Sequence, residues 1–511
     1  MSSDPERSVS HLHVGQRTEL VSRGGGVVTV SEKINEIGFG LYQIQVTILC
    51  SGFVISEAAC LQTASGLSSA ITNHFELSSG SGLGKSMHLM LAFSGFAIGT
   101  LASGICGDTY GRRYPMLIGY LGMIGCALCL FMAPTYAMLC MGYFGLGCFA
   151  GVGVPAALIT VAEVTPSRLR GVTNAAMSIS FVLGELWAAL GLRMILPDLV
   201  GPAWRSMVLW SSIPPFALLV FAILSPVSTF DTPPFLGVRG RTTELVSAIN
   251  LMADMNRKPQ CRMALDDNIA VDKQDILSVG EALVKLTTWP YLLYVGVLNL
   301  MFFAKDLAFY GMGIFWPLAW QSSHLGGMHP ATELMLTSAL GLPGVAMAML
   351  LMFTLPRRIA FSLAGIACAI GVACVHGIMD AEAPLGVTGV VLFKLFYPTV
   401  QMTTFLLPSE VFSTQIRVWS MAIICFFGRF GTLLAPVLVN YNKHAFLCTL
   451  STLMFAAVMA VWCLPETKDL ELVNSASKPD SDKGRLATKK DCESQYGSTS
   501  EGLPVKVPRA G

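Results

Sequence analysis

The chain has 511 residues, of which 53% are hydrophobic and 13% are charged, and its formal net charge is +1. So few charged residues cannot cover so much apolar surface in water, which excludes an ordinary soluble protein of this size. The nearly balanced charge gives no indication of nucleic acid or another strongly charged partner.

Long apolar stretches recur along the whole chain. Each has about 20 residues, the length that an α-helix needs to cross the hydrocarbon core of a bilayer. About twelve such helices are expected, near residues 41–64, 86–106, 115–133, 136–162, 174–196, 206–226, 290–316, 331–354, 359–379, 385–407, 418–440 and 444–464. The sequence therefore predicts an all-α, polytopic membrane protein.

A charged and mildly amphipathic segment interrupts this pattern at residues 227–289. It separates a first bundle of six helices, within 41–226, from a second bundle of six, within 290–464. Polar tails flank the bundles at residues 1–40 and 465–511, and the second tail is expected to be mostly disordered. The chain thus divides into two six-helix halves joined by a linker.

Lysine and arginine are distributed unevenly between the two sides of the expected bundle. With the N-terminal tail in the cytosol, 26 of the 33 basic residues fall in predicted cytosolic segments. The loops on the other side hold only Lys85, Arg205 and Lys443. This asymmetry follows the positive-inside rule and predicts that both termini are cytosolic. Whether the membrane is the plasma membrane or that of a vesicle stays open.

A short pattern occurs once in each half. Glu163-Val164, four residues and Leu169-Arg170 return as Glu410-Val411, four residues and Ile416-Arg417. Each copy lies where one apolar segment ends and the next begins. Parallel repeats of this kind are typical of secondary transporters, in which the solute binds between the halves near the middle of the bilayer.

Glycines and charged residues follow the second apolar stretch at a regular spacing: Gly104, Gly107, Asp108, Gly111, Arg112 and Arg113. This segment resembles the signature loop of the major facilitator superfamily. Other motifs fit the sugar-porter and organic-ion-porter branch, namely Gly151-Val152-Gly153-Val154-Pro155, the two copies of the repeat, and Pro465-Glu466-Thr467-Lys468. The resemblance implies a twelve-helix transporter that works by alternating access.

Within that branch, the chain is most similar to transporters related to synaptic vesicle glycoproteins. The matching residues are Ile37-Gly38-Phe39-Gly40, Gln43, Glu57, Lys394, Gly428-Arg429-Phe430-Gly431 and Ala435-Pro436. Two elements of the branch are reduced here. The second-half counterpart of the signature loop is only Pro356-Arg357-Arg358, and the segment from Asp231 to Leu236 departs from the usual motif. The reduced loop keeps a non-transporting receptor or a vesicle-structural protein open as an alternative.

Ionisable residues within the expected spans are candidates for binding the solute or a proton: Glu57, Glu185, Lys305, Asp306, Lys394 and Arg429. A charge at membrane depth costs at least about 2.5–3.5 kcal/mol, so each needs a partner or a purpose. Glu57 either binds a proton or cation in the cavity or pairs with a basic residue. Lys394 and Arg429 either attract an anionic group or pair with Asp306 or Glu57. Lys305 and Asp306 are adjacent on one helix, so they point about 100° apart and are expected to face different spots.

Charged residues at the cytosolic helix ends are expected to form inter-helix ion pairs that hold an inner gate shut: Asp108, Arg112, Arg113, Glu163, Arg170, Glu410 and Arg417. Breaking such pairs gives two states of similar energy, as alternating access requires. The alternative is that these residues only anchor helix ends.

The sequence favours a carrier that moves a small organic solute by alternating access, with an organic anion and symport with protons left open. It contains no recognisable metal cluster, nucleophile triad, nucleotide motif or cofactor site. The chain is therefore not expected to be an enzyme. Its expected partners are the solute, the lipid bilayer and, with coupling, protons.

Overall fold

The computed structural model describes residues 28–77, 82–264, 269–270, 279–323, 327–376, 383–412 and 414–467. Twelve helices in these segments are long and apolar enough to cross a membrane, which confirms the predicted all-α, twelve-helix fold. The described strands are two-residue pieces, β1 (Val28–Thr29) and β2 (Ile269–Ala270), which pair in parallel. The predicted tails before residue 28 and after Thr467 lie outside the described residues.

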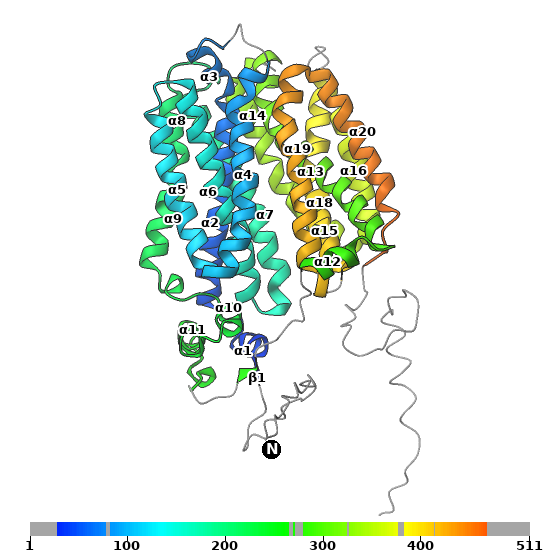
Figure 1. Ribbon diagram of the computed structural model, residues 1–511. Coiled ribbons are helices and arrows are strands. Elements are labelled where there is room, and N and C mark those ends of the chain that lie inside the picture. Colours follow the sequence, from blue (N-terminus) through cyan, green and yellow to red (C-terminus); the bar gives the residue numbers. More distant parts are fainter. Residues whose placement is uncertain are drawn as a thin grey trace, which may run out of the picture.

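The first half contains six spans (Figure 1). Their helices are α2 (Leu41–Gly66), α4 (Gly82–Tyr110), α5 (Arg113–Phe131), α6 (Tyr136–Val164), α7 (Arg170–Ile195), and α8 (Trp204–Ser211) with α9 (Ile213–Leu224). The short helix α3 (Ser68–His74) follows α2 at the end of the bundle drawn uppermost in Figure 1. This end is called the α3 end below.

The second half lies beside the first and also contains six spans (Figure 1). Its helices are α13 (Tyr291–Ser323), α14 (Pro330–Ala339) with α15 (Gly341–Thr354), α16 (Arg357–Cys374), α18 (Ala383–Val411), α19 (Thr414–Tyr441) and α20 (Lys443–Val461). Most ends lie within a few residues of the predicted ones. The largest difference is α13, which continues through Pro317 to Ser323 instead of ending near residue 316.

Small residues let the helices of each half pack closely. Gly95 and Gly99 of α4 face the backbone of α6, and Gly147 and Gly151 of α6 face the backbone of α4 in return. A Cβ atom at any of these four positions would overlap a carbonyl oxygen of the other helix. Such small-residue seams are how membrane helices associate, because lipid supplies no hydrophobic force between them.

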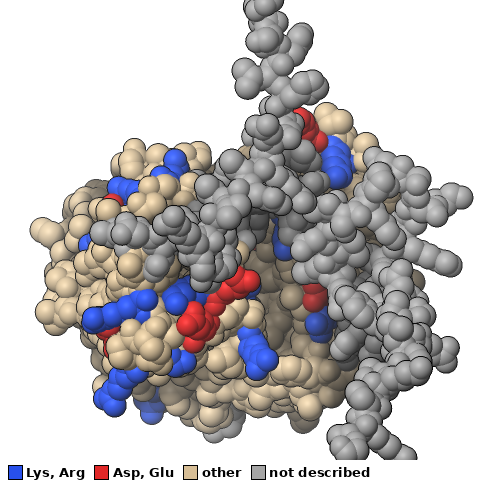
Figure 2. Space-filling view, turned by 90° about the horizontal axis from the view of Figure 1, so that it is seen from below, with Lys and Arg blue, Asp and Glu red and all other residues tan. Residues whose placement is uncertain are grey.

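Short helices of the linker cover the opposite end of the bundle (Figure 1). They are α10 (Pro233–Val238), α11 (Thr242–Met255) and α12 (Val279–Leu286), and α1 (Val30–Ile37) lies beside the first two. We call this the linker end. Seen from there, lysine, arginine and acidic side chains gather on the surface (Figure 2).

The linker is attached to the start of the first span through Asn256. Its amide oxygen accepts the backbone N–H of Tyr42 at 3.1 Å, and its amide nitrogen donates to the Gly38 carbonyl at 3.1 Å. Beside it, the Arg262 guanidinium donates to both oxygens of Asp254 at 2.6 and 2.7 Å and lowers the pKa of that carboxyl. The Asn256 bonds therefore fix the linker against the first half, whereas the Arg262–Asp254 pair lies within the linker.

Candidate functional site

A polar cluster at the linker end of the first half is centred on Arg112, just before α5. Its guanidinium donates to the Gly107 carbonyl at 2.5 Å and lies 3.4 Å from Glu163 Oε1 at the end of α6. The Thr232 hydroxyl donates to the other carboxylate oxygen of Glu163. Glu163 therefore joins the start of α5 to the segment that follows the sixth span.

Asp231 completes this cluster by capping α5. One of its carboxylate oxygens accepts the backbone N–H groups of Arg112 at 2.7 Å and of Arg113 at 3.0 Å. An acid at a helix N-terminus satisfies free N–H groups and interacts favourably with the helix dipole. The Arg113 guanidinium donates to the Thr229 carbonyl at 2.6 Å, so it holds the same segment.

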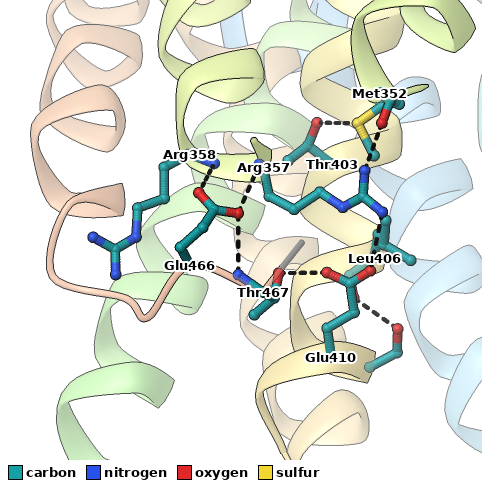
Figure 3. Close-up of polar contacts among 9 residues, drawn as sticks. Met352, Arg357, Arg358, Thr403, Leu406, Glu410, Glu466 and Thr467 are labelled. Carbon is teal, nitrogen blue, oxygen red and sulfur yellow. Dashed lines mark hydrogen bonds and ion pairs between the residues drawn. The ribbon is translucent and has the colours of Figure 1, made fainter. Parts of the chain in front are cut away.

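The second half builds the same cluster around Arg357 (Figure 3). The Arg357 guanidinium donates to the Met352 carbonyl at 2.6 Å and lies 3.4 Å from Glu410 Oε1. The Thr467 hydroxyl donates to the other oxygen of Glu410. Glu466 caps α16 by accepting the backbone N–H groups of Arg357 at 2.8 Å and Arg358 at 3.2 Å.

The two elements that the sequence presents as reduced therefore still place an arginine beside an acid and a capping acid on the next helix in each half. Although the second-half loop is reduced in sequence, Arg357 makes the same kinds of bond as Arg112, and the backbone N–H groups of Arg357 and Arg358 are capped like those of Arg112 and Arg113. An acid followed by threonine after the sixth span of each half was the available signal. Sequence reasoning omitted these cluster residues from the site: Asp231, Thr232, Arg357, Glu466 and Thr467.

Two further predicted gate residues bind backbone instead of acids. Arg170 Nε donates to the Thr165 carbonyl at 3.4 Å, and Arg417 Nε donates to the Phe412 carbonyl at 3.3 Å. Each guanidinium thus joins the start of one helix to the end of the preceding one, as in the helix-anchor alternative. The side chain of Asp108 lies outside the described residues, and a gate role for the whole set stays a prediction.

Polar contacts between the two halves gather at the α3 end among the described residues. Ser69 donates to Gln321 at 2.8 Å, and the amide of Asn440 donates to Ser86 at 2.9 Å. His329 Nδ1 lies 2.9 Å from a carboxylate oxygen of Asp198. The Ala331 backbone N–H donates to the Pro197 carbonyl at 3.1 Å. These bonds hold the halves together at this end, whereas the Arg112 and Arg357 clusters each lie within one half.

Asp306 is the centre of a buried charge network near the middle of α13. Lys305 Nζ lies 2.5 Å from one of its oxygens, and Arg429 of α19 lies 3.6 Å from the other. Lys305 also lies over the Phe405 ring at 4.3 Å, and Arg429 over the Phe96 ring at 4.6 Å. The expectation that Lys305 and Asp306 face different spots is wrong, because the long lysine stem bends back to its neighbour.

Glu57 of α2 lies in the first half and is only 3% exposed. It makes no hydrogen bond or ion pair with another described residue. Arg429 is near enough to act on its charge, and Arg429 also contacts Asp306. The charge of this arginine of the second half therefore acts on an acid of each half.

A narrow cavity lies between α7 and α18. Glu185 of α7 and Lys394 of α18 lie on its wall, with 3.0 Å between Oε2 and Nζ. Lys394 thus pairs across the halves with Glu185, which differs from the predicted partners Asp306 and Glu57. The side chains beside this pair are Phe181, Phe309, Trp316, Phe393, Tyr397 and Gln401.

Comparison with known proteins shows which family the chain resembles. The model of the family described as "Sugar (and other) transporter" matches residues 45–476. The "Organic cation/carnitine transporter 7" of Arabidopsis thaliana is 21% identical and covers 85% of this chain and 92% of its own length. The human "Putative transporter SVOPL" is 24% identical over 45% of this chain and 44% of its own length.

Solved structures show the same fold. A partially occluded, inward-open conformation of the xylose transporter XylE from E. coli superposes with a TM-score of 0.61 at 15% sequence identity. The match covers 84% of this chain and 99% of that structure. At this identity the likeness concerns the arrangement of helices.

Proposed function

The chain belongs to the sugar (and other) transporter family, and from that premise we propose that it carries a small organic ion across a membrane by alternating access. Family membership confirms the sequence-based resemblance, and it makes the protein a multi-pass membrane transporter. The Glu185–Lys394 pair, which joins the two halves on the cavity wall, is the observation that supports an ionic solute. A buried charged pair favours an ionic solute over a neutral sugar, because charge at this depth needs a charged partner.

Alternating access is supported by the different contacts at the two ends. At the α3 end, polar bonds join one half to the other, as between Ser69 and Gln321. At the linker end, the Glu163 and Glu410 clusters hold each half together internally. Two bodies that are rigid at one end and bonded to each other at the opposite end can rock about a central site.

Coupling to protons is assigned to Glu57. Among the acids expected at membrane depth, Glu185 pairs with Lys394 and Asp306 pairs with Lys305 and Arg429. Glu57 has no such bond to a described residue, so its buried carboxyl group can bind a proton without breaking an ion pair. Arg429 then responds to the charge of Glu57 while it remains beside Asp306.

The orientation follows from the distribution of basic residues. Lysine and arginine gather at the linker end, and the sequence places 26 of 33 basic residues on that side (Figure 2). We therefore assign both termini to the cytosol and the α3 end to the opposite side. The protein moves its solute without covalent chemistry, as its named relatives are transporters.

A non-transporting receptor on the same scaffold is less well supported. Each half places an arginine beside an acid and a threonine hydroxyl on the same acid, and the second cluster joins residues that lie far apart in the sequence, such as Glu410 and Thr467. A protein that no longer changes conformation would have little use for the same gate-side cluster in both halves.

Exchange assays in proteoliposomes test the transport function. We expect at least one labelled organic ion to exchange across the membrane, and Glu185→Gln to abolish that exchange. Glu244→Gln is the control, because Glu244 belongs to an exposed pair with Arg241 on the linker helix α11. Exchange of neutral sugars alone, unaffected by Glu185→Gln, would contradict the proposal.

A further inference from the structure

We propose that His376 and His444 bind a divalent transition-metal ion, of which Zn²⁺ is the probe, at the α3 end of the second half. His376 lies just after α16, and His444 lies in the first turn of α20. The Nδ1 atoms of the two rings are 3.2 Å apart. Neither histidine lines the cavity between α7 and α18, so the inference does not depend on what the protein transports.

The packing of α16 against α20 brings the two histidines together (Figure 1). The Ser451 hydroxyl of α20 donates to the Ala369 carbonyl of α16 at 2.8 Å. His376 follows Ala369 by seven residues and His444 precedes Ser451 by seven, which is about two helical turns in each case. The backbone keeps a right-handed helical conformation at Val375, the residue between α16 and His376. Because the two helices run in opposite directions, this register brings both imidazoles to the same level.

The separation of the two nitrogens suits one shared ion. Zn²⁺ binds imidazole nitrogen at about 2.0–2.1 Å with nearly tetrahedral angles, which places two such nitrogens about 3.3 Å apart. The observed distance between the Nδ1 atoms of His376 and His444 is 3.2 Å. The described residues contain no cluster of three or more metal-ligating side chains, so water fills the other positions around the ion. A proton shared between the rings gives a similar distance, and metal binding therefore has to be measured directly.

Cys448 supplies the kind of supporting contact that metal-bound histidines use. It lies four residues after His444, on the same face of α20, and its Sγ is 3.7 Å from Nε2 of His376. A metal-ligating histidine almost always donates its other ring N–H to a nearby acceptor. When Nε2–H of His376 is donated to this sulfur, Nδ1 carries the lone pair that binds the ion. Cys448 is therefore a positioning residue of the site.

The site is open to water at the end of the bundle. His444 and Cys448 are exposed, and His444 comes two residues after Asn442, the residue that caps the start of α20. A hydrated ion therefore reaches the two rings without entering the core. Once bound, the ion joins the ends of α16 and α20, which belong to the same half.

Zn²⁺ binding to the purified full-length protein in detergent tests the site. The affinity is measured by titration calorimetry after treatment with a chelator, and the melting temperature is a second readout. We expect one saturable site that raises the melting temperature. His376→Gln and His444→Gln should each weaken Zn²⁺ binding by more than the tenfold to hundredfold, roughly, that the loss of a supporting contact costs. The double variant should bind no more weakly than either single variant, because both remove the same site.

His74→Gln is the matched control. His74 is also an exposed histidine at the α3 end, but its Nε2 lies 3.5 Å from the guanidinium of Arg205, which repels a metal cation. This variant should keep the Zn²⁺ affinity of the parent chain. Cys448→Ala should weaken binding by about tenfold to a hundredfold, and Cys448→Ser, which keeps an acceptor, should recover part of the loss. With a chelator present, every variant should melt at the temperature of the parent chain, which separates loss of binding from loss of folding.

Each contrary result has a distinct meaning. A parent chain without a saturable Zn²⁺ site overturns the inference and leaves the two rings sharing only a proton. Unchanged affinity in His376→Gln or His444→Gln also overturns it, because the metal then binds elsewhere. An equal loss in His74→Gln shows that exposed histidines bind Zn²⁺ without a defined site. Binding as weak in Cys448→Ser as in Cys448→Ala overturns the positioning role and makes the sulfur a ligand.

Discussion

The linker end and the middle of the bundle follow different rules of symmetry. At the linker end, Arg112 and Arg357 each lie 3.4 Å from an acid, Glu163 and Glu410 respectively. In the middle, the symmetry is absent. Glu185 follows Arg170 in the first half. The residue at the same separation after Arg417 in the second half is Thr432, so Glu185 has no acidic counterpart there.

This difference separates a shared mechanical role from a specific chemical one. Both halves must keep their helix ends together when they rock, so the same cluster serves twice. The middle carries Glu57 in one half and the Asp306 network in the other, as expected if the proton and the solute each bind at one proposed place. On this proposal, the symmetric clusters serve the transport cycle and the asymmetric charges bind the solute and the proton.

The largest effect is expected at Asp306. Asp306→Asn leaves Lys305 and Arg429 without their shared acid, and both bases lie at membrane depth. Removing one partner from a buried charge network costs about 3–5 kcal/mol. The melting temperature of the purified protein should fall clearly, and Lys305→Met in the same chain should restore part of the loss. An unchanged melting temperature in Asp306→Asn would show that the network does not stabilise the fold.

Glu57→Gln is expected to change coupling more than stability. A glutamine cannot release a proton, so an inward proton gradient should no longer accelerate uptake. Counterflow exchange should persist, since it needs no net movement of protons. The two assays are run on the same proteoliposomes, with Glu244→Gln as the control. Full gradient-driven accumulation in Glu57→Gln would move the coupling site to Asp306 or Glu185.

The symmetry of the linker end is tested by a matched pair of variants. Glu163→Gln and Glu410→Gln each remove the charge that faces an arginine at 3.4 Å. Each should lower the exchange rate, because the cluster loses about 2–3 kcal/mol of interaction free energy. The two rates should fall by similar factors. A large effect in one half with none in the other would break the comparison and limit the gate to one side.

Much of this fold is predictable because bilayer thickness fixes the length of an apolar helix. The repeat around Glu163 and Glu410 also located both linker-end clusters. The partners of these acids were harder to predict, because Thr232 lies 69 residues after Glu163 and depends on where the sixth span ends.

The pairings in the middle required the three-dimensional arrangement of helices. Lys394 meets Glu185 across 209 residues, and the packing of α14 and α15 of the second half against α7 brings them together. The Lys305–Asp306 contact was missed for a different reason. Helical geometry fixes the direction of a Cβ atom, but a flexible lysine stem carries its charge well away from that direction.

The smallest effect is expected from the two threonines that complete the clusters. Thr232→Val and Thr467→Val keep the shape of the side chain and remove one hydroxyl donor to Glu163 and Glu410. Each acid retains its arginine, so the cluster should lose about 1.5 kcal/mol of interaction free energy. This is the lower end of the range for a hydrogen bond to a charged group. Exchange rates should fall by similar small factors in both variants. The double variant should show the sum of the two losses, because the clusters lie in different halves and share no residue. A combined loss well above that sum would mean that the clusters are coupled through the movement of the halves.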